Sequence, residues 1–425
     1  MARFLFCPAP EPGDLFPTVP LALALRSRGH DVAYVLDPDL DLGLEHAGVR
    51  SFFVRNGVYG PEAPRVPERP CAALQRLPAQ VELLGRVCDD FCPNVLVDGT
   101  FPFAPRLLAE RRSLPHASLF AGCYPIPTRD PLFPHGPGLP PPTTERGRTL
   151  ARLSTLIQRD READEVAVWD AARASLGLRP SGGHPWRSAA SPWLVLLASS
   201  PAFEYPRTDL PPQFWFIGPL LWQAPLAAMP DRIAALSTDE PIVYVSQGAT
   251  YNAHPVVIEL AIAALGGEPV RVVATVVRDF DPAEFGALPA NVMLERFVPF
   301  LDLVDRLSLA ITHAGAGAVH AALSRGIPLV LLPLTADQSE IAARCEWAGA
   351  GIRLDPTTCT PEALRTAVRR VLAEPGFRAN ARRIMASHAR LNAPDLGASL
   401  LERLAETRQP VLRPASADPW ATTTL

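Results

Sequence analysis

The chain has 425 residues, 48% of them hydrophobic, which is enough for two domains that each bury a core of their own. Its 40 Lys and Arg side chains against 44 Asp and Glu give a net charge of −4 without a basic run, so we expect no nucleic-acid partner. The seven cysteines are scattered and form no CxxC pair, which argues against a disulfide framework and a zinc site. The first residues hold no apolar stretch suited to a secretion signal or membrane span, so we expect a cytoplasmic protein without stable membrane insertion.

In the first half of the chain, short apolar runs alternate with helical patterns. The predicted strands are residues 4–6, 32–36, 95–97 and 194–197. A Pro/Gly-rich turn at 8–17 precedes a helix from Thr18 to Arg28, which Gly29 ends, and a long helical pattern covers 149–176. This strand–helix–strand order predicts an α/β domain with a doubly wound parallel sheet.

A second strand–helix rhythm follows a stretch rich in Pro and aromatic residues at 201–219. Its predicted strands are residues 242–245, 271–277, 310–312 and 329–332. We therefore divide the chain into an N-terminal domain (1–205), a linker (206–222), a C-terminal domain (223–395), a helix that returns to the N-terminal domain (396–408) and a disordered tail (409–425).

The most informative motif is the glycine-rich sequence THAGAGA at 312–318, between an apolar strand and a helical run. A turn of this kind exposes unpaired N–H groups at the positive end of a helix, where a phosphate can bind. Many parallel-sheet proteins use glycine here only to pack a helix on a strand, so the motif alone leaves both interpretations open.

The next strand is followed by PLTADQ at 333–338, which places Asp337 and Gln338 at the carboxyl edge of the predicted sheet. A carboxylate and an amide there suit the hydroxyl groups of a sugar. The alternative is that Asp337 caps the following helix, and the two roles can coexist.

These motifs belong to a longer pattern. The run from Glu295 to Gly351, ERFVPF…THAGAGAVHAALSRGIPLVLLPLTADQSEIAARCEWAGAG, resembles the donor-binding signature of the inverting family 1 glycosyltransferases, especially the actinobacterial enzymes that decorate natural products, including the glycopeptide-antibiotic type. The resemblance extends to FEYPR at 203–207, FIGPL at 216–220, VYVSQG at 243–248 and PGDLFPTVPLALALRSRGHDV near the N-terminus. It implies the GT-B fold, with two Rossmann-like domains that face a central cleft, and a nucleotide-sugar donor.

The resemblance also implies roles for individual residues. It assigns to the donor site Gly13, Ser246, Gly248, Phe297, Val298, His313, Gly315, Gly317, Ala318, Asp337 and Gln338. In the family's pattern Phe297 stacks on the base, His313 approaches the diphosphate and Asp337 holds sugar hydroxyls with its neighbour Gln338. A lone histidine is more often a satisfied structural residue, so the role of His313 depends on the family.

Several donor-side positions depart from the family's pattern. Ala318 stands where the family usually has Thr or Ser, and Ala321 replaces a Glu that grips ribose hydroxyls in many UDP-sugar enzymes. Phe300 and Ile341 replace a common Gln and Asn. Because a deoxyribose lacks the 2′-hydroxyl, we expect a dTDP-sugar rather than a UDP-sugar.

Inverting transfer needs a base that takes a proton from the acceptor. Many family members carry a His in the first turn, whereas this chain has Gly13-Asp14-Leu15-Phe16-Pro17. A related branch of the family is similar in having Gly-Asp in this turn, which makes Asp14 the expected base. Asp98 matches the family's acidic partner of the catalytic His, and in this chain Asp14 and Asp98 could share a proton. The alternative is a turn residue at Asp14 that caps the next helix and a structural acid at Asp98.

For the acceptor we expect an apolar pocket beside the Pro-rich segment 124–142. Its predicted aromatic lining is Phe16, Phe101, Phe103, Phe120 and Tyr124, although such residues could equally belong to the core. The expected acceptor is a small hydrophobic natural product. We expect no metal and no cofactor beyond the nucleotide sugar as co-substrate, because helix N-termini and backbone amides can carry the diphosphate charge; Asp279-Phe280-Asp281 is interpreted as a solvated loop.

Two other functions remain in competition with glycosyl transfer. One is a catalytically silent relative that binds a ligand or assists a partner enzyme. The absence of the usual His and the presence of Ala318 and Ala321 would suit it. A nucleotide-sugar epimerase of the same architecture would turn over its donor without an acceptor. The sequence leaves a homodimer open.

Overall fold

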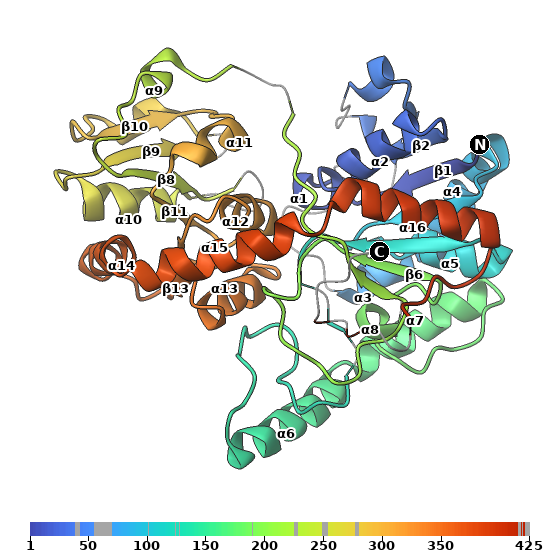
Figure 1. The fold of residues 1–425 in the computed structure, drawn as a ribbon. Coiled ribbons are helices and arrows are strands. Elements are labelled where there is room, and N and C mark those ends of the chain that lie inside the picture. Colours follow the sequence, from blue (N-terminus) through green and yellow to red (C-terminus); the bar gives the residue numbers. More distant parts are fainter. Residues whose placement is uncertain are drawn as a thin grey trace.

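The computed structural model describes residues 1–38, 43–54, 70–100, 102–123, 125–126, 128–188, 190–224, 228–248, 254–276, 280–414, 418 and 420. The described chain forms two parallel sheets, one in each half, with helices on both faces (Figure 1). The expected α/β class and the two Rossmann-like domains of the GT-B fold are confirmed.

The N-terminal sheet has seven strands in the order β3-β2-β1-β4-β5-β6-β7. Its strands are β1 (Arg3–Cys7), β2 (Asp31–Leu36), β3 (Arg50–Phe53), β4 (Val95–Asp98), β5 (His116–Phe120), β6 (Leu194–Leu197) and β7 (Phe214–Phe216). The central strands are buried along nearly their whole length, because helices cover both faces, and this is why they read as continuous apolar runs. The order reverses between β1 and β4, and ligands of doubly wound sheets bind at such a point.

The helices of this half are α1 (Pro12–Leu15), α2 (Thr18–Ser27), α3 (Pro70–Gln75), α4 (Leu77–Phe91), α5 (Ala104–Arg112), α6 (Glu145–Arg161), α7 (Ala163–Ser175) and α8 (Pro185–Ser188). The short α1 lies within the segment expected to be a plain turn. Gly29 takes a left-handed φ of 83° just after Arg28, the C-cap residue of α2, as the sequence predicts. The helical pattern at 149–176 is two helices, which break at Glu162.

The C-terminal sheet has six strands in the order β10-β9-β8-β11-β12-β13. They are β8 (Ile242–Ser246), β9 (Arg271–Thr275), β10 (Val292–Glu295), β11 (Leu309–Thr312), β12 (Leu329–Leu331) and β13 (Gly351–Arg353). The helices are α9 (Asp231–Ala234), α10 (Val256–Leu265), α11 (Phe300–Leu303), α12 (Ala316–Leu323), α13 (Gln338–Trp347), α14 (Pro361–Ala373) and α15 (Pro375–Ala389). Here the strand order reverses between β8 and β11.

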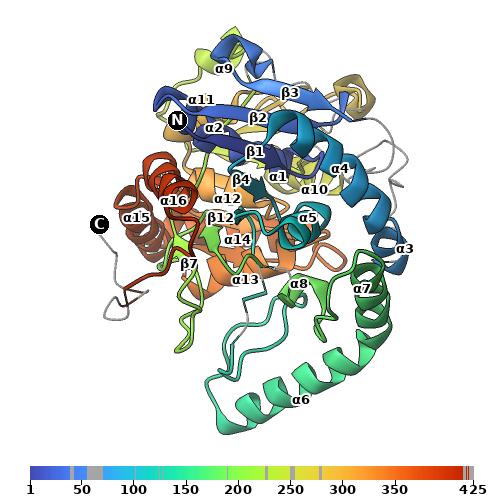
Figure 2. The same ribbon diagram turned by 90° about the vertical axis from the view of Figure 1, so that its right-hand side faces the viewer.

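The segment expected to link the domains does more than connect them. It contributes β7, which pairs in parallel with β6 and completes the N-terminal sheet. The last helix, α16 (Ala393–Thr407), lies beside α2 (Figure 2). Arg28, the C-cap residue of α2, bonds with Asp395 and Glu402 of α16.

The segment after α16 also differs from the disordered tail that we expect. Val411 is buried, and its carbonyl accepts a hydrogen bond from the Trp215 indole at 2.9 Å. Arg413 donates to the carbonyls of Phe214 and Leu210. The tail therefore packs against the N-terminal sheet at residues 411–413. No helix among the described residues is long and apolar enough to cross a membrane.

Candidate active site

Asp14 lies where the N-terminal sheet reverses its strand order. Its Oδ2 accepts a hydrogen bond at 2.7 Å from the Ala9 N–H, which follows β1, and its Oδ1 accepts one at 2.6 Å from the Thr100 N–H, which follows β4. The side chain is only 3% exposed, and this burial raises its pKa from the ordinary 3.8 to about 6, although the two amides act in the opposite direction. The carboxylate is thus fixed in place and more basic than a free aspartate.

Asp98, the expected partner of Asp14, is fully buried at the end of β4. Its Oδ2 accepts a hydrogen bond from Arg106 Nε at 2.8 Å and lies 3.2 Å from His116 Nε2. The charge of Asp98 contributes to the raised pKa of Asp14, but it is the smallest of the contributing causes. The contacts therefore favour the structural interpretation of Asp98, as the anion that pairs with Arg106.

The glycine-rich turn forms the N-terminus of α12 at the reversal point of the second sheet. Gly315 is the N-cap and provides no side-chain cap, so the N–H groups of the first turn are left for another partner. Gly317 borders open space, which lets a ligand come close to the backbone. The left-handed residue of this turn is Ala314, with a φ of 66°, and Ala336 of the neighbouring loop has a φ of 53°. Two strained alanines thus flank the candidate donor site, and strain of this kind clusters at functional sites.

His313 is held between the two loops that meet at this point. A Cβ on Gly248 would fall 2.6 Å from the His313 ring, and one on Gly315 would fall 2.5 Å from it, so both positions require glycine. Burial lowers the pKa of His313 to about 4, although a hydrogen bond to the backbone of Ser246 acts in the opposite direction. The imidazole is therefore neutral near pH 7, and its Nδ1 has no protein partner among the described residues.

Asp337 reaches from the C-terminal domain to the N-terminal one. Although it is the N-cap residue of α13, its side chain makes no cap hydrogen bond; instead Oδ2 accepts one at 3.0 Å from the Cys123 N–H, just after β5. Burial raises its pKa. Gln338 Oε1 accepts hydrogen bonds from the N–H groups of Leu334 and Thr335 and thereby shapes the loop that carries Asp337.

The remaining predicted donor residues lie around the same edge. Phe297 is half-buried in the loop after β10, and Val298 beside it is packed in the core. Ser246 ends β8, and its hydroxyl accepts a hydrogen bond from the Gly248 N–H. The φ of Gly248 is 84°, a left-handed conformation that requires glycine. Gly13 is exposed in α1, directly before Asp14.

The predicted acceptor aromatics have other partners. Phe16 makes an edge contact with Trp222 of the linker, Phe103 packs against Trp169 and Trp186, and Phe120 is a core residue. Phe101 and Tyr124 lie outside the described residues. Phe103 and Phe120 both lie against the Arg106 guanidinium, whose carbon is 5.3 and 5.5 Å from the two ring centres, and neither they nor Phe16 line the cavity described next.

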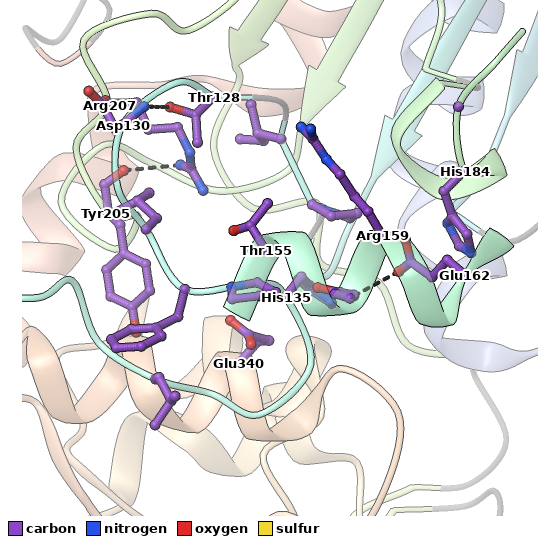
Figure 3. A pocket seen from close by; sticks show the side chains of 18 of the residues that line it. Thr128, Asp130, His135, Thr155, Arg159, Glu162, His184, Tyr205, Arg207 and Glu340 are labelled. Atoms are coloured by element: carbon purple, nitrogen blue, oxygen red, sulfur yellow. Dashed lines mark hydrogen bonds between the residues drawn. The ribbon is translucent and has the colours of Figure 1, made fainter. Parts of the chain in front are cut away.

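A cavity of about 790 Å³ lies instead between the Pro-rich loop, α6 and the start of α13. Figure 3 shows His135, Arg159 and Glu340 around it, and Ile126, Leu132, Phe133, Leu139 and Val166 supply apolar surface. His135 Nε2 lies 3.1 Å from the Cys123 carbonyl, and the Cys123 N–H bonds to Asp337. The cavity thus adjoins the residue expected to hold the donor sugar.

An ion-pair network that no sequence motif predicted holds this loop against the donor domain. Glu340 accepts hydrogen bonds from the N–H groups of Gly136 and Gly138, at 2.7 and 2.9 Å, and bonds to Arg344 at 2.8 Å. Arg344 also contacts Glu204 at 2.8 Å and lies over the Tyr205 ring. Burial acts against ionisation of both carboxyls, but Arg344 brings their net pKa below the ordinary range. The signal available in the sequence was the i,i+4 spacing of Glu340 and Arg344.

The described residues contain no group of His, Cys, Asp and Glu side chains arranged to hold a metal ion. Asp281 of the Asp-x-Asp sequence caps the short helix at Pro282–Phe285 and pairs with Arg296 at 3.0 Å, while Asp279 lies outside the described residues.

Comparison with known proteins agrees with this geometry. The C-terminal domain model of the erythromycin biosynthesis protein CIII-like family matches residues 261–404. The 4'-demethylrebeccamycin synthase of Lentzea aerocolonigenes is 34% identical over 95% of this chain and 99% of the synthase.

Two solved structures superpose on nearly the whole chain. The calicheamicin glycosyltransferase CalG4 does so with a TM-score of 0.75 at 25% identity, covering 96% of this chain and 99% of its own. The glycosyltransferase VinC in complex with dTDP has a TM-score of 0.66 at 22% identity, covering 95% and 99%. The near full-length match to the synthase, together with the two facing sheets, shows that the chain belongs to the family 1 glycosyltransferases of the GT-B fold, inverting and metal-independent enzymes of the actinobacterial natural-product type.

Proposed function

We propose that this glycosyltransferase moves a sugar from a dTDP-sugar to a hydrophobic natural-product acceptor, with Asp14 as the general base and no cofactor beyond the donor. The observation that carries the proposal is the buried Asp14 carboxylate, which two backbone amides fix at the reversal point of the N-terminal sheet and whose pKa is raised to about 6. At neutral pH such a group is ionised and accepts a proton more readily than an ordinary aspartate. It suits a base that takes the acceptor proton as the new bond forms.

On the donor side, the diphosphate would lie against the N-terminus of α12. Uncapped N–H groups and the helix dipole favour the negative charge that develops on the leaving group, so no bound cation is required. Neutral His313 carries a single N–H, and by donating it to a phosphate oxygen in place of the Ser246 backbone it would bind the diphosphate without adding charge. Asp337 and Gln338 sit one loop away, where the sugar would lie.

The preference for dTDP is based on Ala321. This residue is buried in α12 and replaces the family's ribose-binding Glu, so no carboxylate is available there for a 2′-hydroxyl. Deoxyribose loses nothing by that substitution. The solved complex of VinC with dTDP adds support from a protein of the same fold.

For the acceptor we assign the cavity beneath the Pro-rich loop. Its volume of about 790 Å³ is within the range of sites that enclose drug-sized molecules, and its wall combines apolar side chains with a few polar ones. The relative from Lentzea aerocolonigenes is named for the formation of 4'-demethylrebeccamycin. We therefore propose a hydrophobic natural-product acceptor of a size that this cavity can enclose.

Titration calorimetry with dTDP and UDP tests the donor proposal, and the expected result is tighter binding of dTDP. Ala321→Glu should move the ratio of the two affinities toward UDP. Equal affinities, or tighter UDP binding by the unaltered protein, would contradict the preference for dTDP. Release of dTDP from a dTDP-sugar panel, measured with and without hydrophobic natural-product acceptors, tests the reaction, and release that does not depend on any acceptor would contradict it.

A further inference from the structure

Helix α6 presents an apolar face to solvent, on the side away from the cavity. Leu150, Leu153, Leu156 and Ile157 are 48%, 50%, 59% and 55% exposed. Their spacing of three, four and seven residues places them on one side of the helix. In both ribbon views α6 projects from the body of the molecule (Figures 1 and 2). Contiguous exposed leucines on a projecting helix mark an interaction surface more often than scattered ones do.

The charges on this face are arranged symmetrically about Leu153. Arg146 lies seven residues before Leu153 and Asp160 seven residues after it, while Leu150 and Leu156 lie three residues to either side. All of these side chains are exposed, and neither Arg146 nor Asp160 has an ion-pair or hydrogen-bond partner in the described part of the chain. The face thus carries a positive end, an apolar centre and a negative end.

We propose that α6 is a self-association surface, on which the α6 helices of two copies pack antiparallel about a twofold axis near Leu153. An inverted copy places Leu150 opposite Leu156 of the second copy and Arg146 opposite Asp160. A twofold interface repeats each such contact, so both ends gain an ion pair. This pairing covers the exposed leucines and gives Arg146 and Asp160 an ion-pair partner each. A second copy of the same chain is sufficient to form it.

A membrane surface is the other occupant that an apolar helix face can suit, but the charges do not fit it. Interfacial helices keep acidic groups off the apolar face, because that face is buried at the boundary of headgroups and acyl chains, where a carboxylate loses its hydration and is repelled by anionic lipids. Here Asp160 continues the apolar face. Among the arginines of α6, Arg148 pairs with Glu145 at 2.8 Å and Arg159 lines the cavity on the opposite side.

The expected dimer is weak. One pair of helices covers less surface than the roughly 800 Å² per partner of a standard stable interface, so we expect dissociation in the range of about micromolar concentration. The opposite side of α6 carries Thr155, Gln158 and Arg159, which line the cavity. Self-association therefore steadies one wall of that cavity.

Sedimentation velocity of the full chain over a concentration series tests the proposal. We expect a reversible monomer–dimer equilibrium that Leu153→Glu abolishes, because the substitution places two like charges against each other at the axis. Arg146→Asp alone and Asp160→Arg alone should each weaken the dimer by about threefold to tenfold, since both ion pairs become like-charge contacts. The combined Arg146→Asp and Asp160→Arg protein should regain the original dissociation constant.

Arg152→Asp is the matched control, because Arg152 is exposed on the same helix but off the apolar face. It should leave the dimer unchanged, and far-ultraviolet circular dichroism should show that every variant keeps its helices. A protein that is monomeric at all concentrations would overturn the proposal. So would a dimer that ignores Leu153→Glu, a double variant without recovery, or association only with anionic vesicles of phosphatidylglycerol.

Discussion

The carboxylate of Asp14 lies directly against Gly99. A Cβ built on Gly99 would fall 1.9 Å from Oδ2 and 2.6 Å from Oδ1, far inside contact distance. The absence of a side chain at residue 99 is thus what lets the carboxylate reach the N–H groups of Ala9 and Thr100. Four residues from two segments of the chain, the connection after β1 and the loop after β4, thus form one unit around the proposed base.

Replacing the carboxylate tests its role directly. We expect Asp14→Asn to lower the turnover number by at least ~10²-fold, the low end for loss of a general base, while dTDP binding stays within about twofold. Steady-state kinetics with calorimetry separate the two effects. Turnover near that of the unaltered enzyme would remove Asp14 from the base role.

The raised pKa of Asp14 predicts a pH dependence. Because the base must be ionised, kcat/KM should rise with pH and level off above about 6, and Asp14→Asn should lose this limb. The stability effect has the opposite direction. A raised pKa means that the folded state holds the proton more tightly, so Asp14 contributes stability below its ordinary pKa of 3.8 and loses it as the pH rises through about 6. A limb near pH 4 would contradict the shift.

Gly99→Ala should imitate loss of the base although it leaves Asp14 in place. The added methyl group displaces the carboxylate from its two amides, so we expect turnover to fall by more than about tenfold with unchanged dTDP affinity. Gly376→Ala is the matched control, since a Cβ there meets nothing within 4 Å. Equal kinetics in the two variants would show that the contact with Gly99 does not position the base.

Arg344 should be the residue of the interdomain network whose loss costs most stability. It is 2% exposed and neutralises Glu204 and Glu340, so Arg344→Met leaves Glu340 buried without its cation and Glu204 with Arg207 alone, at 3.4 Å. Removing one partner of a buried pair typically costs about 3–5 kcal/mol of unfolding free energy. Urea denaturation measures this, and a loss below about 1 kcal/mol would contradict it.

Glu340→Ala should act on the acceptor rather than on the donor. The substitution releases the Gly136 and Gly138 amides and so detaches the Pro-rich loop from α13. We expect a higher KM for the acceptor with dTDP affinity nearly unchanged. Glu406→Ala, at an exposed position of α16, is the control. An effect on dTDP affinity alone would place the acceptor elsewhere.

The sequence by itself determined the two doubly wound sheets, the stop at Gly29 and the position of the glycine-rich turn. These follow from local patterns, because apolar runs, helix periods and glycine conformations are properties of neighbouring residues. It also placed Asp14, His313 and Asp337 at carboxyl ends of strands, where topology brings them to the two reversal points.

Only the tertiary structure decided what these residues touch. Asp98 is paired with Arg106, Phe120 is in the core, and residues 214–216 of the expected linker form β7. The cavity and its network depend on contacts such as Glu340 with Gly136, between residues 204 positions apart in the chain. Burial, and with it the raised pKa of Asp14, exists only once segments distant in sequence have closed around a side chain, and no local pattern encodes that closure.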